Sequence, residues 1–232
     1  MISWNNFLKT FKYMQLFWEG LVCTVSLSAL SVVAGFILAL VLATMRLAKF
    51  KPLRFVATTY VELFRATPMM VQLFLIYHVA LAGVSLPTFK LFGFIRFERF
   101  IPGVIALSLN SGAYLCEIVR SGIQSVDLGQ TEAARSLGLT AWQNMRYIVL
   151  PQAMKNILPA IANEFVTIIK ESSIAWTIGV QDIMGAVNSV TAATFSMAEP
   201  LIVATCIYFC LTYPTSKVIQ HFERKMSRGD KR

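Results

Sequence analysis

The sequence predicts an all-α integral membrane protein with five membrane-spanning helices in one domain. Hydrophobic residues make up 56% of its 232 residues and charged residues 14%, whereas soluble domains contain roughly 45 to 50% apolar and about 25% charged residues. Five segments reach the roughly 20 apolar residues that a helix needs to cross the hydrocarbon core. Lys and Arg are also divided unevenly between the two sides that these segments define.

The five apolar segments are residues 20–45, 55–82, 101–120, 157–178 and 200–219. Before the first of them, apolar residues recur at spacings of three and four from Trp4 to Trp18. This pattern predicts that residues 1–19 form an amphipathic helix in the membrane interface. We assign residues 20–220 to the transmembrane domain and residues 221–232 to a basic cytoplasmic tail.

The connecting segments set the orientation. Fourteen Lys and Arg residues fall on one side, five on the other and two within the apolar segments. The side with fourteen is expected to be cytoplasmic, which places the N-terminus outside and the C-terminus inside. We therefore expect a multi-pass membrane protein.

Composition and motifs argue against several other classes. The net charge of +9 is explained by basic residues at helix ends, so no nucleic acid partner is expected. Cys23, Cys116, Cys206 and Cys210 lie in apolar segments, and the pair spaced by four has no neighbouring His, so no metal site is expected. Neither H-E-x-x-H nor G-x-S-x-G occurs, which argues against an intramembrane enzyme.

The polar interval of residues 121–155, between the third and fourth apolar segments, is the most informative part of the chain. Gly138 lies between two stretches that favour helix, and we expect it to adopt the left-handed conformation that ends a helix. Thr131 is predicted to cap the helix before it, and Thr140 the helix after it. The interval therefore predicts a helical hairpin at the cytoplasmic surface.

The same interval resembles the EAA loop of ATP-binding-cassette (ABC) importer permeases through Glu132, Ala133, Ala134, Gly138, Ile148, Leu150 and Pro151. Residues 60–73 (YVELFRATPMMVQL), 113–130 (AYLCEIVRSGIQSVDLGQ) and 163–173 (NEFVTIIKESS) resemble the polar amino acid branch of that family, the histidine, glutamine, glutamate and arginine type. The resemblance covers about residues 17–225. It implies the type I importer fold, with cytoplasmic coupling helices between the third and fourth spans, and a function as a permease subunit for polar amino acids.

The resemblance also implies a location in the bacterial cytoplasmic (inner) membrane. The partners that it implies are a second permease subunit, identical or homologous, two cytosolic ATPase subunits, an extracytoplasmic amino-acid-binding protein, and membrane lipid. The chain has no G-x-x-x-x-G-K-[ST] motif, so we expect it to bind no cofactor, with ATP and Mg²⁺ on the partner ATPases. Coupling to the ATPases is expected through Glu132, Ala133, Ala134, Gly138, Leu139, Ile148, Leu150 and Pro151.

Charges inside the apolar segments are expected to pair or to line water, because an unpaired charge at the centre of a membrane helix costs about 2.5 to 3.5 kcal/mol. Two such pairs, Glu62 with Arg65 and Glu117 with Arg120, are predicted in the inner half of the membrane. They form either a structural ion-pair network or an inner gate that moves with the ATPases.

The substrate pathway is expected near the membrane midplane. Pro68 is expected to kink the second segment, with Thr67 partly replacing the lost hydrogen bond. Lys170 would attract a carboxylate and Glu171 an ammonium group or a cationic side chain; alternatively, these two residues only pair with other helices. The candidate residues of the pathway are Gln72, His78, Lys170, Glu171, Ser172 and Ser173.

Two alternative functions are a permease for another small polar solute and a stand-alone secondary carrier or channel. A secondary carrier usually shows paired repeats and more spans. The sequence shows five apolar segments without an internal repeat, which favours a subunit that needs a partner chain to enclose a pathway.

Overall fold

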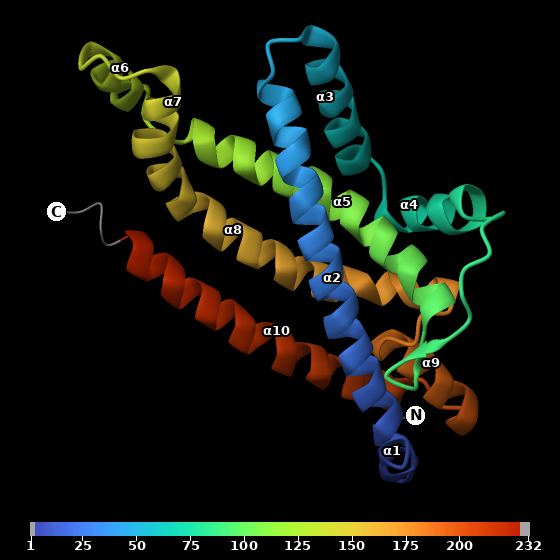
Figure 1. Cartoon of the computed structure of the whole chain (residues 1–232). Coiled ribbons are helices and arrows are strands. Elements are labelled where there is room, and N and C mark those ends of the chain that lie inside the picture. Colours follow the sequence, from blue (N-terminus) through green and yellow to red (C-terminus); the bar gives the residue numbers. More distant parts are fainter. Residues whose placement is uncertain (1–2, 228–232) are drawn as a thin grey trace.

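The computed structural model describes residues 3–227, which fold into a bundle of long helices with a short β-hairpin (Figure 1). The elements in order are α1 (Trp4–Phe11), α2 (Met14–Leu47), α3 (Lys51–Ala66), α4 (Met69–Leu75), η1 (Ile76–Ala80), β1 (Lys90–Leu91), β2 (Ile95–Arg96), α5 (Phe97–Gln124), α6 (Leu128–Ser136), α7 (Ala141–Asn144), η2 (Met145–Val149), α8 (Leu150–Glu171), η3 (Ser172–Ile178), α9 (Ile183–Thr194) and α10 (Ala198–Ser227). The η1 and η2 segments are π-helical and η3 is a 3₁₀ helix.

Small residues allow α2 and α5 to pack closely at the centre of the bundle. A Cβ atom added to Gly35 of α2 would lie 3.1 Å from the backbone nitrogen of Gly112 in α5. Ser31 and Ala39, one turn before and after Gly35, are fully buried. Close backbone approach at such positions is how membrane helices gain packing energy.

The second predicted segment, residues 55–82, is broken rather than kinked. α3 and α4 meet at Thr67 and Pro68 with a bend of 113°. Thr67 and Pro68 both have extended backbone angles, because a proline disfavours the helical conformation of the residue before it. The bend expected at Pro68 is therefore confirmed, and the helix is interrupted there as well as bent.

Within residues 3–227, three helices are long and apolar enough to cross a membrane, and the bent pair of α3 and α4 would make four. The three are Met14–Leu47, Phe97–Gln124 and Ala198–Met226. They contain the first, third and fifth predicted segments. The fourth segment, residues 157–178, is divided between α8 and the 3₁₀ helix η3.

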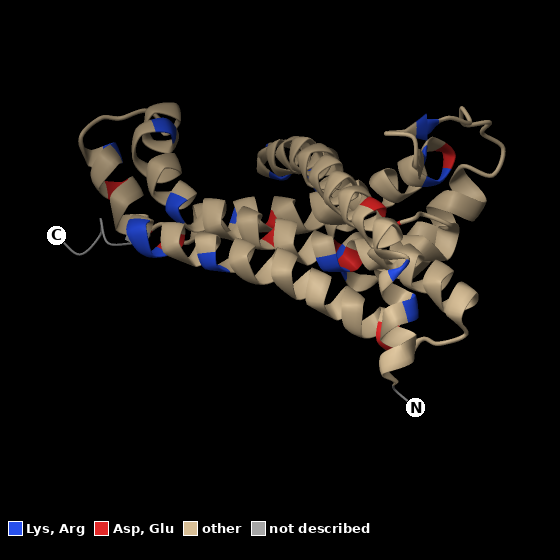
Figure 2. Ribbon diagram, turned by 90° about the horizontal axis from the view of Figure 1, so that it is seen from below, with Lys and Arg blue, Asp and Glu red and all other residues tan. Residues whose placement is uncertain are grey.

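The two ends of the bundle carry different features. α6 and α7 lie at the same end as the C-terminus, and α1 and α9 lie at the opposite end (Figure 1). Basic residues occur at the end with α6 and α7 and along the C-terminal half of α10 (Figure 2). α10 continues into the predicted basic tail, of which residues 228–232 lie outside the described residues.

Candidate functional site

Local hydrogen bonds fix the turn of the helical hairpin between α5 and α8. Gly138 has a φ of 81°, which glycine adopts without strain. Its N–H donates to the carbonyl of Arg135 at 2.9 Å, and the N–H of Leu139 donates to the carbonyl of Ala134 at 3.1 Å. This pair of bonds is the Schellman motif. The left-handed conformation predicted for Gly138 is therefore confirmed.

The second arm of the hairpin starts at the predicted cap. Thr140 Oγ1 accepts a hydrogen bond from the Gln143 N–H at 3.3 Å, and Gln143 Oε1 accepts one from the Thr140 N–H at 2.8 Å. The two bonds form a reciprocal capping box. α7 then continues through η2 directly into α8, so a force on this arm would reach a long helix of the bundle.

The first arm starts earlier than predicted. Asp127, rather than Thr131, caps α6, and its Oδ1 accepts from the Gly129 N–H at 2.6 Å. Thr131 lies within α6, where its Oγ1 accepts from Asn144 Nδ2 of α7 at 3.2 Å. Asp is at least as good an N-cap as Thr, so the helix extends back to the earlier residue and Thr131 joins the two arms instead.

The hairpin exposes large apolar side chains. Leu137 at the turn is 81% exposed and Trp142 is 68% exposed, and Leu128 and Tyr147 are also exposed. Ala134 is buried between the arms. Of the other predicted coupling residues, Leu139 and Ile148 are half-buried, and the exposed ones are Glu132, Ala133, Gly138, Leu150 and Pro151. An exposed apolar patch on a polar segment is typical of a protein-binding surface.

Glu117 is the centre of an arginine cluster between α2, α3 and α5. Its Oε2 lies 2.9 Å from Arg46 Nη1 and 3.7 Å from Arg65 Nη1, and Arg120 pairs with the same carboxylate. The predicted pair of Glu117 and Arg120 is present. Arg65 pairs with Glu117 rather than with Glu62, which is exposed and has no ion pair among the residues described.

Gln72 holds the break between α3 and α4. Its Nε2 donates to the carbonyls of Phe64 and Thr67 at 2.8 and 3.0 Å, which are acceptors left free at the end of α3. Its Oε1 accepts from Asn110 Nδ2 of α5 at 2.9 Å. Gln72 and Asn110 are both buried. This predicted pathway residue therefore replaces backbone hydrogen bonds lost at Pro68, a role that its position in the sequence did not indicate.

The candidate residues at the end of α8 point in different directions. Lys170 is exposed and Glu171 is half-buried, as expected for neighbours about 100° apart on a helix. Ser172 is fully buried and donates to the carbonyl of Ile169 at 2.9 Å. Ser173 is half-buried.

Glu164 was not among the predicted site residues, although it is buried in α8. It lies seven residues before Glu171, a spacing that places both carboxylates on one face of the helix. This spacing is the signal in the sequence that could have identified it. The two acids together place two carboxyl groups on one face of α8, which packs against α5.

His78 lies in the wall of an open cavity of about 480 Å³ at the end of the bundle opposite the hairpin. Glu98 and Arg99 of α5 also line the cavity. Arg99 donates to the carbonyl of Ile178 at 3.3 Å and lies 5.4 Å from the ring centroid of Tyr77. The cavity therefore presents charges of both signs.

Comparison with known proteins finds a match along most of the chain. Residues 21–228 match the family described as binding-protein-dependent transport system inner membrane component. The arginine transport system permease protein ArtQ of Bacillus subtilis is 41% identical over 212 residues, 91% of this chain and 93% of that protein. The nopaline transport system permease protein NocM of Agrobacterium fabrum is 40% identical over 198 residues, 84% of this chain and 81% of that protein.

Solved structures agree with the sequence matches. The crystal structure of an amino acid ABC transporter with histidines superposes with a TM-score of 0.87 at 42% identity, covering 97% of this chain and 99% of that chain. The inward-facing MetNI methionine ABC transporter has a TM-score of 0.66 at 17% identity, covering 90% and 97% of the two chains, and shares the fold.

Proposed function

The chain belongs to the family of binding-protein-dependent transport system inner membrane components, and from this premise we propose that it carries polar amino acids across the membrane as the permease subunit of an ATP-driven importer. Relatives named for arginine and nopaline transport, and the structural match to an amino acid transporter, support this substrate class. ATP hydrolysis belongs to separate ATPase subunits in this family. ATP and Mg²⁺ would bind there, and this chain would need no cofactor.

The exposed hairpin is the observation that carries the proposal. Leu137 and Trp142 are exposed on a segment that stands apart from the bundle, and a chain without a nucleotide motif must receive its energy from a partner. An ATPase that seats the hairpin would cover these side chains. Its closure would then move α8, which is continuous with α7.

The proposed topology has five spans: α2, the bent pair α3 and α4, α5, α8 with η3, and α10. The N-terminus would be outside, with α1 in the membrane interface as residues 1–19 were predicted to be, and the C-terminal tail and hairpin would be cytoplasmic. The charge asymmetry of the connecting segments supports this orientation. The protein would lie in the bacterial inner membrane with a second permease subunit, two ATPase subunits and an extracytoplasmic binding protein.

The proposed substrate pathway runs along the face of α8 that carries Glu164 and Glu171. Their carboxylates would attract the ammonium group or a cationic side chain of an amino acid, and the open cavity beside His78 would be its outer entrance. Lys170, being exposed on another face of α8, would contact the second subunit or a substrate carboxylate. The arginine cluster around Glu117 would close the inner end.

The coupling role is tested by Leu137→Asp in the transporter reconstituted with its ATPase and binding protein. The charged side chain would be buried without a partner in the ATPase cleft, so we expect uptake driven by ATP to fall at least about tenfold. Phe222→Asp is the matched control, because Phe222 is an exposed apolar residue of α10 outside the hairpin. Equal uptake by the two variants, with normal membrane insertion, would refute the docking role.

The pathway is tested separately by uptake kinetics of Glu164→Gln and Glu171→Gln. We expect each variant to raise the KM for cationic amino acids more than for neutral ones, because the lost charge attracts the former. Glu223→Gln serves as the control, because it makes the same change at an exposed position of α10 outside the proposed pathway. Unchanged kinetics in both acidic variants would place the pathway elsewhere and leave the coupling role untouched.

A further inference from the structure

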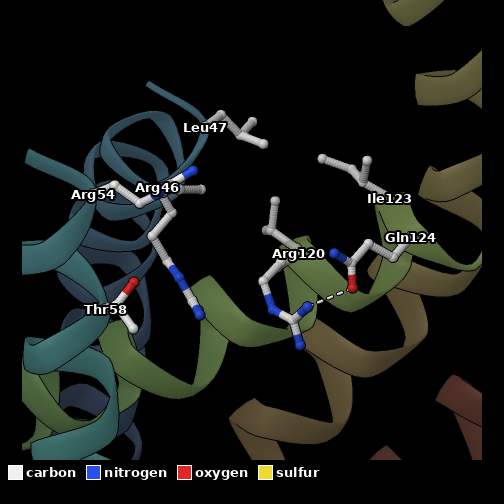
Figure 3. A pocket seen from close by; sticks show the side chains of 9 residues that line it. Arg46, Leu47, Arg54, Thr58, Arg120, Ile123 and Gln124 are labelled. Carbon is white, nitrogen blue, oxygen red and sulfur yellow. Dashed lines mark hydrogen bonds between the residues drawn. The ribbon is translucent and has the colours of Figure 1, made fainter. Parts of the chain in front are cut away.

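A cavity of about 210 Å³ opens between α2, α3 and α5. One arginine from each of these helices reaches it: Arg46, Arg54 and Arg120 (Figure 3). Thr58 and Gln124 add hydrogen-bonding groups to its wall. The rest of the lining is apolar and consists of Ala43, Leu47, Val119 and Ile123.

Positive charge at this cavity exceeds negative charge. Glu117 already accepts from Arg46 and Arg120 and also lies within 3.7 Å of Arg65. The side chain of Arg54 is exposed and makes no hydrogen bond or ion pair within the described part of the chain. Three guanidinium groups therefore share one carboxylate, and the fourth, that of Arg54, has no anionic partner in the described structure. A bound anion would relieve the repulsion between these positive charges.

The apolar part of the lining indicates that this anion also carries a hydrocarbon portion. Leu47 is 63% exposed, and Phe55, next to Arg54 on α3, is 70% exposed. Basic clusters beside membrane helices attract anionic lipid headgroups, each Lys or Arg strengthening binding by about fivefold. We propose that the cavity binds the phosphate headgroup of an anionic phospholipid, with its acyl chains against Leu47 and Ile123.

A lipid bound in this cavity would connect the start of α3 with the end of α5, next to the coupling hairpin. Arg54 lies in the first turn of α3, just after its connection with α2, whereas Gln124 ends α5, which leads within a few residues to Asp127 and α6. In the proposed topology the lipid belongs to the cytoplasmic leaflet. It would therefore anchor the base of the hairpin to the membrane surface.

The test uses the full chain in nanodiscs that contain equal amounts of phosphatidylglycerol and phosphatidylcholine, with retained lipids counted by native mass spectrometry. We expect preferential retention of phosphatidylglycerol and a loss of about fivefold in Arg54→Gln. Arg54→Lys, which keeps the charge, should retain most of the binding. Lys49→Gln is the matched control, because it removes the same charge from the connection between α2 and α3 without lining the cavity.

Three outcomes would overturn the proposal. Equal retention of the two lipids would show that the cavity does not select an anionic headgroup. Equal losses in Arg54→Gln and Lys49→Gln would show general attraction by the basic surface. A second experiment measures the binding of inorganic phosphate to the detergent-solubilised chain. If phosphate binds in a way that depends on Arg54, and phosphatidylglycerol does not, the cavity binds a soluble anion instead of a lipid.

Discussion

The hairpin of α6 and α7 and the broken pair of α3 and α4 both turn the chain sharply, but different contacts hold them. At the hairpin, the bonds that set the turn join near neighbours, such as Leu139 with Ala134 and Thr140 with Gln143. At the break, Gln72 binds Asn110, which is 38 positions away along the chain. The turn of the hairpin is therefore determined locally, whereas the break also depends on a contact with α5.

This difference suits the two regions to different roles in transport. A locally held hairpin keeps its shape while it moves with an ATPase, so it can transmit displacement as a rigid unit. A break held by Gln72 and Asn110 would change when α5 moves, and in the proposed topology it lies within the membrane. We therefore expect substitutions at the break to affect the whole bundle and substitutions at the hairpin to act locally.

Asp182 gives the largest expected effect, because its carboxyl group is fully buried and makes only a local contact. Its Oδ1 caps α9 by accepting from the Gly185 N–H at 2.8 Å, while its Oδ2 is buried without a hydrogen-bond partner in the described structure. Burial raises the pKa of this carboxyl, which lies between the fourth and fifth apolar segments, from 3.8 to about 7. The folded protein therefore binds a proton that the unfolded chain has lost at pH between about 4 and 7.

Stability should consequently fall as the pH rises through this window and level off above it. Asp182→Asn keeps a cap oxygen but carries no charge, so it should remove this pH dependence and raise stability at pH 8 by at most about 4 kcal/mol. Melting temperatures in nanodiscs at pH 5, 6 and 8 measure the effect. Asp127→Asn, the same change at an exposed cap, is the control. If the melting temperature of the wild type depended on pH between 5 and 8 in the same way as that of Asp182→Asn, the assignment would be contradicted.

Gln72→Leu gives the next largest effect. It leaves the carbonyls of Phe64 and Thr67 and the amide of Asn110 without their partner, and each buried unsatisfied group costs about 1 to 3 kcal/mol. We expect a loss of stability of about 3 kcal/mol, measured as a lower melting temperature. Gln15→Leu is the control, because Gln15 makes only an exposed bond with Glu19 at 3.0 Å. If the two variants melted alike, α5 would not hold the break.

The same contrast explains which features the sequence could predict. Gly138 and Thr140 were identified correctly because their roles depend on residues within one or two turns. The cap of α6 was misplaced because Asp127 and Thr131 both fit the local pattern, and the bond from Asn144 to Thr131 comes from the other arm.

Long-range contacts could not be predicted from the sequence pattern. The charge of Glu117 suggested that it has a partner, and the adjacent turn supplied Arg120. Arg46, 71 positions earlier, becomes a partner only when α2 packs on α5. The bend at Pro68 was placed correctly, but its 113° angle depends on Gln72 replacing the lost bonds from outside α3.

Gly138→Val should have a smaller, local effect. A β-branched residue at a φ of 81° costs about 1 to 2 kcal/mol. An added Cβ meets no atom within 4 Å, so the effect comes from the backbone alone. We expect faster amide exchange in residues 128–144 and reduced uptake, with an unchanged melting temperature of the bundle. Gly83→Val is the control. An added Cβ at Gly83 also meets no atom within 4 Å, and the backbone there is not left-handed. If Gly138→Val changed amide exchange but left uptake normal, coupling would not depend on the shape of the hairpin, and the prediction would be wrong.

Thr140→Ala should have the smallest effect and gives the sharpest comparison of the two regions. It removes the side-chain half of the capping box, which contributes about 1 kcal/mol, while Gln143 still accepts from the backbone N–H of residue 140. Amide exchange in α7 should therefore accelerate by about fivefold. Exchange in α3 and α4 should stay the same, because no described bond of the capping box reaches them.

Thr44→Ala is the control, since Thr44 is exposed and its hydroxyl only donates to the carbonyl of Val41 within α2. Faster exchange at the break in Thr140→Ala would show that the hairpin and the break form one cooperative unit, and the division into a local and a long-range element would be wrong.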